Sequence, residues 1–442
     1  MPRAALNRCA ARAASRAAPR PPRRIRPFPH SSFTLHFFTL LSLSGSQQKI
    51  FLRLVTVLRP HWHTDPSLPL RIQQEFAANR SFGSRDRKLY RELLYTTLRF
   101  LPWIEPLFDT DPTRAAQCVA WLAADLPATR AYRAGTCGDW PACPPSVAAK
   151  AKHLGADAAT VLPAWLPRHC PAAGLAPDLD ALHSRAALWL RLQTPDAAPV
   201  LAEFTSLGWP SRVSRVVPGA VELLAEADIT KTKAFLAGLV EVQDLGSQMI
   251  LASAGIAPGE RWLDACAGAG GKSLQLAALL GPTGHIDAYD IRPSALKELQ
   301  IRAQRAHLTQ IALLNAAPSG LYDGVLVDAP CSGSGTWRRA PHLKWTTTPA
   351  QVTAAAATQL QLLTTYSAHV RPGGRLLYAT CSLSRFENEA VVADFLAANP
   401  AFKPEAPAQN FGFTADPATG GLTILPARHN TDGFFVAALR RA

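Results

Sequence analysis

Three short stretches in the second half of the 442-residue chain hold residue types that perform chemistry. The first is glycine-rich, with the sequence Asp-Ala-Cys-Ala-Gly-Ala-Gly-Gly-Lys-Ser at positions 264–273. The second contains Asp328 and Cys331, and the third contains Cys381. Each comes directly after an apolar run. A glycine-rich turn near carboxyl and thiol groups indicates a bound ligand that meets a nucleophile and a proton acceptor.

The glycine-rich stretch predicts a strand, a tight turn and the start of a helix. Glycine permits positive φ and the close approach of a ligand, and the helix directs free N–H groups at that ligand. Asp290 ends the next apolar stretch, where a carboxylate commonly accepts hydrogen bonds from ribose hydroxyls. A P-loop would need Gly in place of Cys266, and a dinucleotide fingerprint would need Gly or Ala in place of Ser273. The pattern therefore favours S-adenosylmethionine, which has a ribose but no phosphate.

The two cysteines follow the fourth and fifth strands that we predict for this half of the chain. Neighbouring strands would place Cys331 and Cys381 at the same edge of the sheet as the glycine turn. Carbon 5 of a pyrimidine accepts a methyl group after a thiolate has added to carbon 6, and a base must then remove the proton from carbon 5. Two thiols and Asp328 beside a methyl donor provide these groups. Each thiol taken alone could equally be a small buried apolar residue.

The elements that must position these residues alternate between strand and helix. Apolar runs predict strands near 261–265, 285–290, 310–314, 323–328 and 374–381, with a last apolar segment at 433–439. Helical patterns lie near 272–280, 293–306, 350–369 and 386–398. This alternation predicts a doubly wound, mostly parallel sheet that binds ligands at the carboxyl ends of its strands.

The motifs resemble those of the RNA cytosine-5 methyltransferases, most closely the bacterial RsmB (Sun/Fmu) type. The resemblance rests on residues 264–272, on Asp-Ala-Pro-Cys-Ser beginning at Asp328, and on Ala-Thr-Cys-Ser beginning at Ala379. It is strong over 241–442 and extends weakly to a preceding helical region, similar to a NusB-like RNA-binding domain. It implies a class I S-adenosylmethionine-dependent methyltransferase with a Rossmann-like doubly wound sheet. Its implied activity is methylation of carbon 5 of cytosine in RNA, with small-subunit ribosomal RNA favoured and transfer RNA as the alternative.

The resemblance also implies a role for each motif residue. In this family the attacking thiol corresponds to Cys381, and the thiol that assists product release corresponds to Cys331. Asp328 would contact the cytosine near the methyl donor, and Lys272 would reach toward the target base. The implied S-adenosylmethionine site consists of Cys266, Ala267, Gly268, Ala269, Gly270, Gly271, Lys272, Asp290 and Asp328. The implied contacts to RNA phosphates come from Arg338, Arg339 and Lys344.

Two positions depart from the pattern of this family. Ala269 stands where the family commonly has proline. More importantly, no acidic residue follows the third predicted strand, where the family usually contacts adenine, and Asn315 is the candidate substitute. The missing acid supports an alternative function, a weakly active RNA-binding factor in ribosome assembly that keeps the fold. Formation of 5-methylcytosine would discriminate between the two functions.

The remaining sequence divides into parts of different composition. Residues 1–64 contain ten Arg, one Lys and no Asp or Glu, which predicts a disordered, transit-like or spurious leader. Residues 65–180 show helical periodicity, 181–240 read as a small α/β module, and 241–442 form the catalytic domain. One helix of the second part carries a basic face that could contact RNA, formed by Arg85, Arg87, Lys88, Arg91 and Arg99.

Cysteine spacing and charge restrict the class of protein. The eight Cys include no Cys-x-x-Cys pair, so we expect neither a disulfide framework nor a metal site. The longest apolar run of the leader, 33–43, is too short to span a membrane. Beyond the leader, 35 basic residues nearly balance 32 acidic ones. These features predict a monomer in the cytoplasm, or in an organelle if residues 1–64 are a transit peptide.

Overall fold

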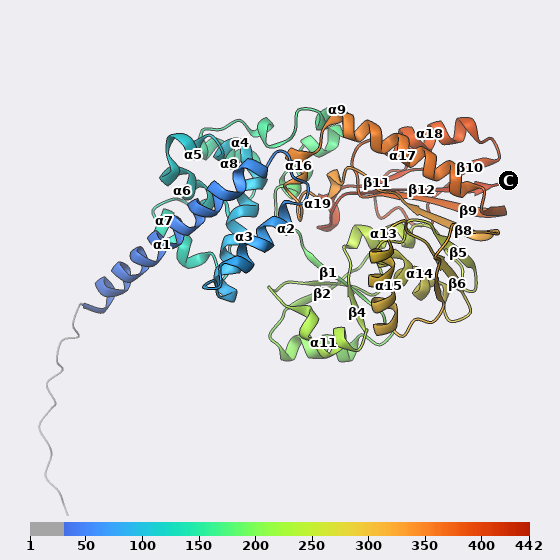
Figure 1. The fold of residues 1–442 in the computed structure, drawn as a ribbon, viewed down its shortest axis with the longest axis horizontal. Coiled ribbons are helices and arrows are strands. Elements are labelled where there is room, and N and C mark those ends of the chain that lie inside the picture. The colour runs from blue at the N-terminus through green and yellow to red at the C-terminus, as the bar shows by residue number, and fades with distance from the viewer. Residues whose placement is uncertain (1–30) are drawn as a thin grey trace, which may run out of the picture.

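A computed structural model describes residues 31–442 of the chain, and its first domain is helical (Figure 1). The long helix α1 (Ser31–Leu58) lies against α2, α3, α6 and α7. The other helices of this domain are α2 (Leu68–Ala78), α3 (Ser84–Arg99), α4 (Leu101–Ile104), α5 (Leu107–Thr110), α6 (Pro112–Leu122), α7 (Arg130–Cys137), α8 (Val147–Leu154), α9 (Leu166–His169) and α10 (Asp178–Leu182). The predicted spacing on α3 buries Leu89, Leu93 and Leu98 in the shared core.

The expected leader at 1–64 is wrong for its last part. Residues 1–30 lie outside the described residues, but the chain is helical from Ser31. Phe51 and Leu58 have no exposed surface, and Trp62 is also buried in the core of the helical domain. Apolar residues spaced three and four apart form the buried face of the last two turns of α1. The basic composition of residues 1–64 as a whole drew attention away from this short pattern.

The second unit is a small module with an antiparallel sheet of order β2-β3-β1-β4. Its elements are β1 (Leu188–Leu192), α11 (Ala198–Ser206), β2 (Ser211–Val213), β3 (Ala220–Leu223), α12 (Lys233–Leu236) and β4 (Val240–Val242). This module therefore combines an antiparallel sheet with short helices. Strand β2 ends at Val213, because the Ser214 hydroxyl then accepts hydrogen bonds from the N–H groups of Val216 and Val217 in the next turn.

The C-terminal domain is built on an eight-stranded mixed sheet of order β10-β12-β9-β8-β5-β6-β7, with β11 paired to β12. The strands are β5 (Arg261–Asp264), β6 (His285–Ala288), β7 (Ile311–Leu313), β8 (Tyr322–Asp328), β9 (Val370–Thr380), β10 (Phe402–Glu405), β11 (Leu422–Ile424) and β12 (Phe434–Arg441). Strands β5 to β9 are parallel, whereas β10, β11 and β12 pair antiparallel. The predicted doubly wound sheet is confirmed, and β10 and β11 are additions to it.

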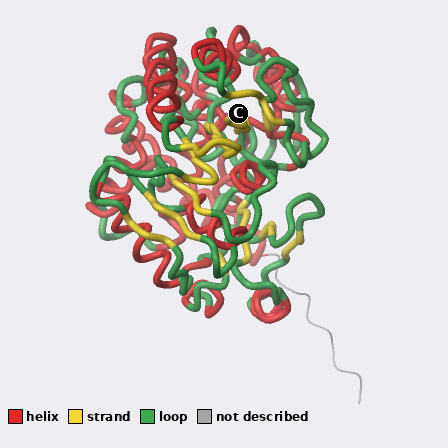
Figure 2. The backbone as a smooth tube through the Cα atoms, turned by 90° about the vertical axis from the view of Figure 1, so that its right-hand side faces the viewer, coloured by secondary structure: helices red, strands yellow, loops and turns green. Residues whose placement is uncertain are grey.

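Helices cover both faces of this sheet (Figure 2). The helices on these faces are α13 (Leu245–Ala252), α14 (Gly271–Leu280), α15 (Pro293–Arg305), α17 (Pro349–Ser367) and α18 (Glu389–Ala398). The short helices α16 (Leu343–Thr346) and α19 (Pro426–His429) lie against the helical domain instead. Side chains alternate along the buried strands, so Leu326 packs with α13 and α14 whereas Val325 packs with α17 and α18. After β5, the chain forms β6 and β7 in succession on one side of β5, and it then forms β8 next to β5 on the opposite side. The strand order therefore reverses between β5 and β8, where such sheets bind ligands.

Lys344 joins the C-terminal domain to the helical domain. Its side chain is 2% exposed, and Nζ donates hydrogen bonds to the carbonyls of Arg99 at 2.7 Å and Val161 at 2.9 Å. It also lies 2.9 Å from Nε2 of His183. Burial lowers the pKa of Lys344 well below its usual value. The short helix α16 is therefore fixed to the helical domain from inside the interface.

We expect Lys344→Ala to weaken this interface by about 3 kcal/mol, because buried carbonyls lose their donor. Urea unfolding followed by tryptophan fluorescence measures the change, since Trp345 on α16 contacts the same domain through the carbonyl of Leu98. The exposed Lys403 on β10 provides the control variant Lys403→Ala. Equal unfolding curves for the two variants would show that Lys344 does not fasten the domains.

Candidate active site

The glycine turn after β5 has the backbone that its sequence predicts. Gly268 and Gly270 adopt φ of +53° and +86°, and Gly270 is the N-cap of α14. A Cβ atom on Gly270 would lie 2.1 Å from Cδ1 of Leu299, so this position requires glycine. A Cβ atom on Gly271 would point into open space. The helix start is consequently accessible to a ligand.

A cavity of about 530 Å³ opens over this turn. We call it the glycine-turn cavity, and it is lined by Ser247, residues 265–269, Gly271, Lys272, residues 290–292, residues 328–330, Thr358, Leu362 and Tyr366. All residues predicted for the S-adenosylmethionine site lie here except two. Gly270 shapes the turn from beneath. Asn315 is exposed and does not line the cavity, so its predicted contact with the ligand is not supported.

Asp290 lies at the rim of the glycine-turn cavity, at the end of β6. Its carboxylate accepts hydrogen bonds from the backbone N–H of Gly268 at 2.8 Å and from the guanidinium of Arg292 at 2.9 and 3.0 Å. Burial alone would raise the pKa of Asp290, but these hydrogen bonds outweigh it and lower the pKa below its usual value. Asp290 is therefore an ionised acceptor that is held in place beside the turn.

The residues around the glycine-turn cavity fit S-adenosylmethionine. Asp290 can accept hydrogen bonds from a ribose, and the start of α14 offers free N–H groups. Ile291, Leu362 and Tyr366 provide apolar wall on which an adenine ring can pack. Beneath the turn, Oδ1 of the fully buried Asp264 has no hydrogen-bond partner, and burial raises the pKa of Asp264 to about 7. When bound there, S-adenosylmethionine would supply an electrophilic methyl group.

The two predicted thiols meet at the carboxyl ends of β8 and β9. These strands are parallel, with Asp328 opposite Ala379, and the Sγ atoms of Cys331 and Cys381 lie 3.4 Å apart. The hydrogen bond from Cys331 lowers the pKa of the Cys381 thiol, although burial opposes this effect. The same hydrogen bond, together with burial, raises the pKa of Cys331 well above its usual value. Cys381 is therefore the thiol that ionises more readily.

Asp328 and Lys272 form an ion pair between the thiols and the glycine-turn cavity. Nζ of Lys272 donates to Oδ2 of Asp328 at 2.7 Å. Lys272 is the more buried of the two, with 9% of its side chain exposed against 30% for Asp328. The charge of Lys272 also lowers the pKa of Cys381 to a lesser extent than the Cys331 hydrogen bond does. A carboxylate and an ammonium group are thus fixed within reach of both the thiols and a bound ligand.

Glu387 joins the two cysteine loops, a function that we did not predict from the sequence. It is fully buried and accepts hydrogen bonds from the backbone N–H of Ser332 at 2.8 Å and from Oγ of Ser382 at 2.6 Å. Nε2 of Gln359 on α17 donates to it at 3.1 Å. Ser332 and Ser382 each follow one of the cysteines. The carboxylate consequently fixes the relative position of the two thiols, and only its place after a Cys-Ser pair could have indicated this.

A second opening reaches Cys331. This groove, of about 320 Å³, is lined by Pro66, Pro330, Cys331, Ser332, Leu343, Thr346, Thr347, Gln351, Ala355 and Thr358. Pro330 and Thr358 line both this groove and the glycine-turn cavity. One ligand in the glycine-turn cavity and a second ligand in this groove would therefore lie next to each other near Cys331.

Two of the three predicted RNA contacts are wrong. Arg338 is 3% exposed and donates to the carbonyls of Thr431 at 2.8 Å and Arg185 at 2.9 Å. Lys344 is buried in the domain interface, as described above. Both side chains donate hydrogen bonds to backbone carbonyls that are distant in sequence, and they thereby hold separate segments of the chain together. Arg339 is exposed and remains a candidate for contact with RNA.

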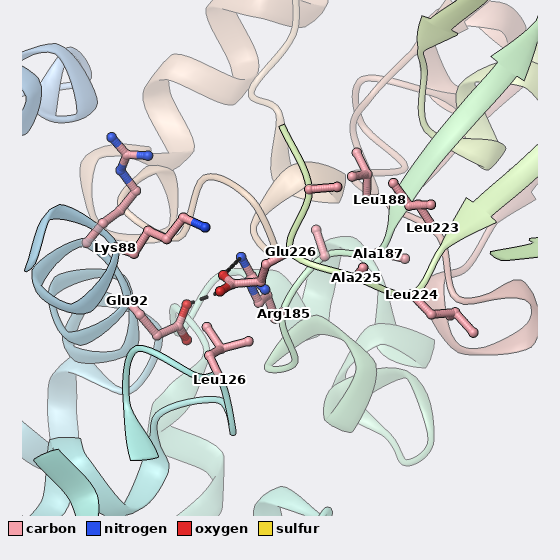
Figure 3. A pocket seen from close by; sticks show the side chains of 13 residues that line it. Lys88, Glu92, Leu126, Arg185, Ala187, Leu188, Leu223, Leu224, Ala225 and Glu226 are labelled. Atoms are coloured by element: carbon pink, nitrogen blue, oxygen red, sulfur yellow. Dashed lines mark hydrogen bonds and ion pairs between the residues drawn. The ribbon is translucent and has the colours of Figure 1, made fainter. Parts of the chain in front are cut away.

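A further cleft, of about 470 Å³, separates α3 from the small module (Figure 3). Lys88 and Arg91 of the predicted basic face line it and are exposed. Arg185 crosses the cleft and pairs with Glu226 at 3.0 Å and, more distantly, with Glu92 at 3.7 Å. Arg99, also part of the predicted face, is instead 4% exposed and donates to the carbonyl of Arg338. The basic face therefore reaches the solvent only near its first two turns.

Residues 251–440 match the family model described as 16S rRNA methyltransferase RsmB/F. This part of the chain is therefore similar to the RsmB/F family. Its relatives include the probable ribosomal RNA small subunit methyltransferase B of Synechocystis, 37% identical over 48% of this chain and 50% of that protein. The protein of the same description from Bacillus subtilis is 34% identical over 56% of this chain and 57% of that protein.

The chain spans about half the length of the curated relatives it matches. A solved structure of a methyltransferase homologue protein from Pyrococcus horikoshii covers 68% of this chain and all of its own, with a TM-score of 0.55 and 23% identity. That likeness supports the class I methyltransferase fold for the C-terminal domain. The groups of three or more His, Cys, Asp or Glu that could hold a metal ion are absent among residues 31–442. Over the same residues, every helix is too short or too polar to cross a bilayer.

Proposed function

We propose that this protein transfers a methyl group from S-adenosylmethionine to carbon 5 of a cytosine in RNA. The observation that carries the proposal is the pair of thiols at 3.4 Å, with opposite pKa shifts, beside the glycine-turn cavity. The match of residues 251–440 to the RsmB/F family model and the small-subunit methyltransferases among the similar proteins support ribosomal RNA as the substrate. The proposed enzyme acts as a monomer in the cytoplasm.

The reaction begins at Cys381. Its thiolate adds to carbon 6 of the cytosine, and the electron pair of the 5,6 double bond moves to carbon 5. Carbon 5 then takes the methyl group from the sulfonium, whose sulfur would keep the electron pair of the broken bond and leave as a neutral thioether. Asp328 and Lys272 line the glycine-turn cavity, where the Asp328 carboxylate can accept a hydrogen bond from the exocyclic amino group of the cytosine and the Lys272 ammonium group can offset the negative charge that develops on the ring. Lys272 holds the Asp328 side chain in that position through the ion pair.

Cys331 completes the reaction by removing the proton from carbon 5. In the adduct, Cys381 is a thioether without negative charge, so the largest of the interactions that raise the pKa of Cys331 is absent. Cys331 can then lose its own proton to the solvent of the groove that it lines, and its thiolate accepts the proton of carbon 5. The electron pair of that C–H bond re-forms the 5,6 double bond and expels Cys381 as a thiolate. Both thiols return to their starting states after one transfer.

The RNA would also bind away from the thiols. Lys88 and Arg91 line the cleft beside α3, and Arg339 is exposed next to the active site. Cations of this kind contact phosphates without reading sequence. A single strand that reaches from the cleft to the groove at Cys331 could present an unstacked cytosine to Cys381.

We expect the purified protein to form 5-methylcytosine in small-subunit ribosomal RNA when S-adenosylmethionine is present. Nucleoside mass spectrometry after digestion of the RNA measures the product, and matched reactions contain transfer RNA or an RNA without cytosine. Product in ribosomal RNA alone supports the proposal. Product in transfer RNA alone would assign the alternative substrate, and its absence from both RNAs and from intact small subunits would contradict the proposed activity.

A further inference from the structure

Asp432 is a buried carboxylate that the proposed reaction does not use. It lies directly before β12 and is 1% exposed. Neither carboxylate oxygen has a hydrogen-bond partner, and its recorded partner is Nε of Arg339, in an ion pair at 3.0 Å. Half of the Arg339 side chain is exposed. A buried carboxylate with so little compensation is costly, so its presence requires a reason other than stability.

The surroundings of Asp432 do not supply that reason. The neighbouring Asp244 already accepts hydrogen bonds from the Thr431 hydroxyl and from the N–H of Gly246, where it caps α13. Burial and the charge of Asp244 raise the pKa of Asp432 to about 7, whereas Arg339 and Arg338 oppose the rise. An ion pair with a half-exposed arginine contributes little to folding. The ion pair between Asp432 and Arg339 is better explained by its effect on the position of the Arg339 side chain.

The backbone around Asp432 is tightly connected to both cysteine loops. The N–H of Gly433 donates to the carbonyl of Gly335 at 2.7 Å, and the N–H of Gly335 donates to the carbonyl of Cys381 at 3.0 Å. A Cβ atom on Gly335 would lie 2.0 Å from the carbonyl oxygen of Gly433, so the segments touch without side chains between them. Asp432 and Arg339 extend from this junction. The backbone segments that carry Asp432 and Arg339 are therefore joined to the loop of Cys381.

Several groups affect the pKa of the Cys381 thiol besides burial. The hydrogen bond from Cys331 has the largest effect, and the charge of Asp328 raises the thiol pKa. Arg339 and Lys272 are cations that both lower this pKa. Lys272 is nearly buried and held by Asp328, but Arg339 is exposed and would move in solvent without an anchor. Asp432 provides that anchor.

We propose that Asp432 is a positioning residue that holds the Arg339 guanidinium beside Cys381, so that a fixed cation faces the attacking thiol. This inference rests on the proposed function, because it takes Cys381 as the nucleophile. It adds a second ion pair to the active site, parallel to Lys272 and Asp328. In this arrangement each cation near the thiol is held by its own carboxylate.

The test measures the pH dependence of Cys381 alkylation by iodoacetamide, followed by peptide mass spectrometry. We expect Arg339→Gln to move the midpoint of alkylation upward by about 1 pH unit, because a nearby cation is lost. Asp432→Asn should move it in the same direction, although this variant removes a negative charge. Loss of a nearby negative charge would by itself lower the pKa of a thiol. An upward shift of the alkylation midpoint in Asp432→Asn therefore shows that Asp432 acts by positioning Arg339. The double variant should shift no further than Arg339→Gln alone.

Two controls accompany these variants. Arg339→Lys keeps the cation and should retain a midpoint near that of the wild type. Arg385→Gln removes an exposed cation from the loop after Cys381 that is not among the groups acting on the thiol, and it should leave the midpoint unchanged. An unchanged or lowered midpoint in Asp432→Asn would overturn the inference. The assay needs neither RNA nor methyl donor, so it stays informative if the protein proves not to make 5-methylcytosine.

Discussion

Replacing Cys381 by alanine is expected to abolish methylation and to prevent any covalent complex with RNA. Cys381 has the lowered pKa of the thiol pair, and no other group near the glycine-turn cavity combines a nucleophilic atom with that property. Cys266 also lines the cavity, but burial raises its pKa strongly. Loss of a covalent nucleophile lowers turnover on the order of 10⁶-fold. The formation of 5-methylcytosine under single-turnover conditions measures this loss.

The control for this variant removes a cysteine far from the site. Cys143 in the helical domain is half-buried like Cys381, and Cys143→Ala should methylate RNA at the rate of the wild type. Binding of RNA should be the same for both variants, because neither removes a charge that faces the solvent. If Cys381→Ala kept more than a small fraction of the activity, the assignment of the nucleophile would be wrong.

Replacing Cys331 by alanine is expected to have the opposite effect on the covalent complex. The addition of Cys381 and the methyl transfer can still occur, but the proton on carbon 5 has lost its acceptor. The adduct should therefore accumulate toward one RNA per protein, whereas the wild type releases it. Denaturing gel electrophoresis detects the complex as a band of lower mobility that carries labelled RNA.

Loss of the Cys331 hydrogen bond also changes Cys381. Because this bond has the largest effect in lowering the pKa of Cys381, addition in the Cys331→Ala variant should need a higher pH than in the wild type. The double variant without both thiols provides the control and should form no complex at any pH. Rapid release of methylated RNA by Cys331→Ala would show that another group removes the proton.

The sequence was sufficient to predict the catalytic domain because its signals are local. The glycine turn, Asp290 and the strands that end at Asp328 and Cys381 depend on residues close together in the chain. Alternating apolar runs indicated the order of strands and helices, and parallel neighbours then required the thiols to share one edge of the sheet. The additional strands β10 and β11 were missed because they are short and pair only with β12.

The errors involve residues whose surroundings come from distant parts of the chain. Arg338 and Lys344 look like free cations in the sequence, but carbonyls of Arg185, Thr431, Arg99 and Val161 enclose them after folding. No local pattern encodes such partners. The position of Glu387 between the two cysteine loops likewise depends on the pairing of β8 with β9, so its function could not be predicted from the sequence.

The identity of the thiol that bonds to the base tests the account most directly. An RNA substrate that contains 5-fluorocytosine can undergo addition and methyl transfer, but the fluorine cannot leave as a proton does, so the adduct persists on the attacking thiol of the wild-type protein. Digestion of the complex and mass spectrometry then show which peptide carries the nucleotide. We expect the modified residue to be Cys381 alone. A nucleotide attached to Cys331, or no adduct in an RNA that the protein methylates, would contradict the proposed mechanism.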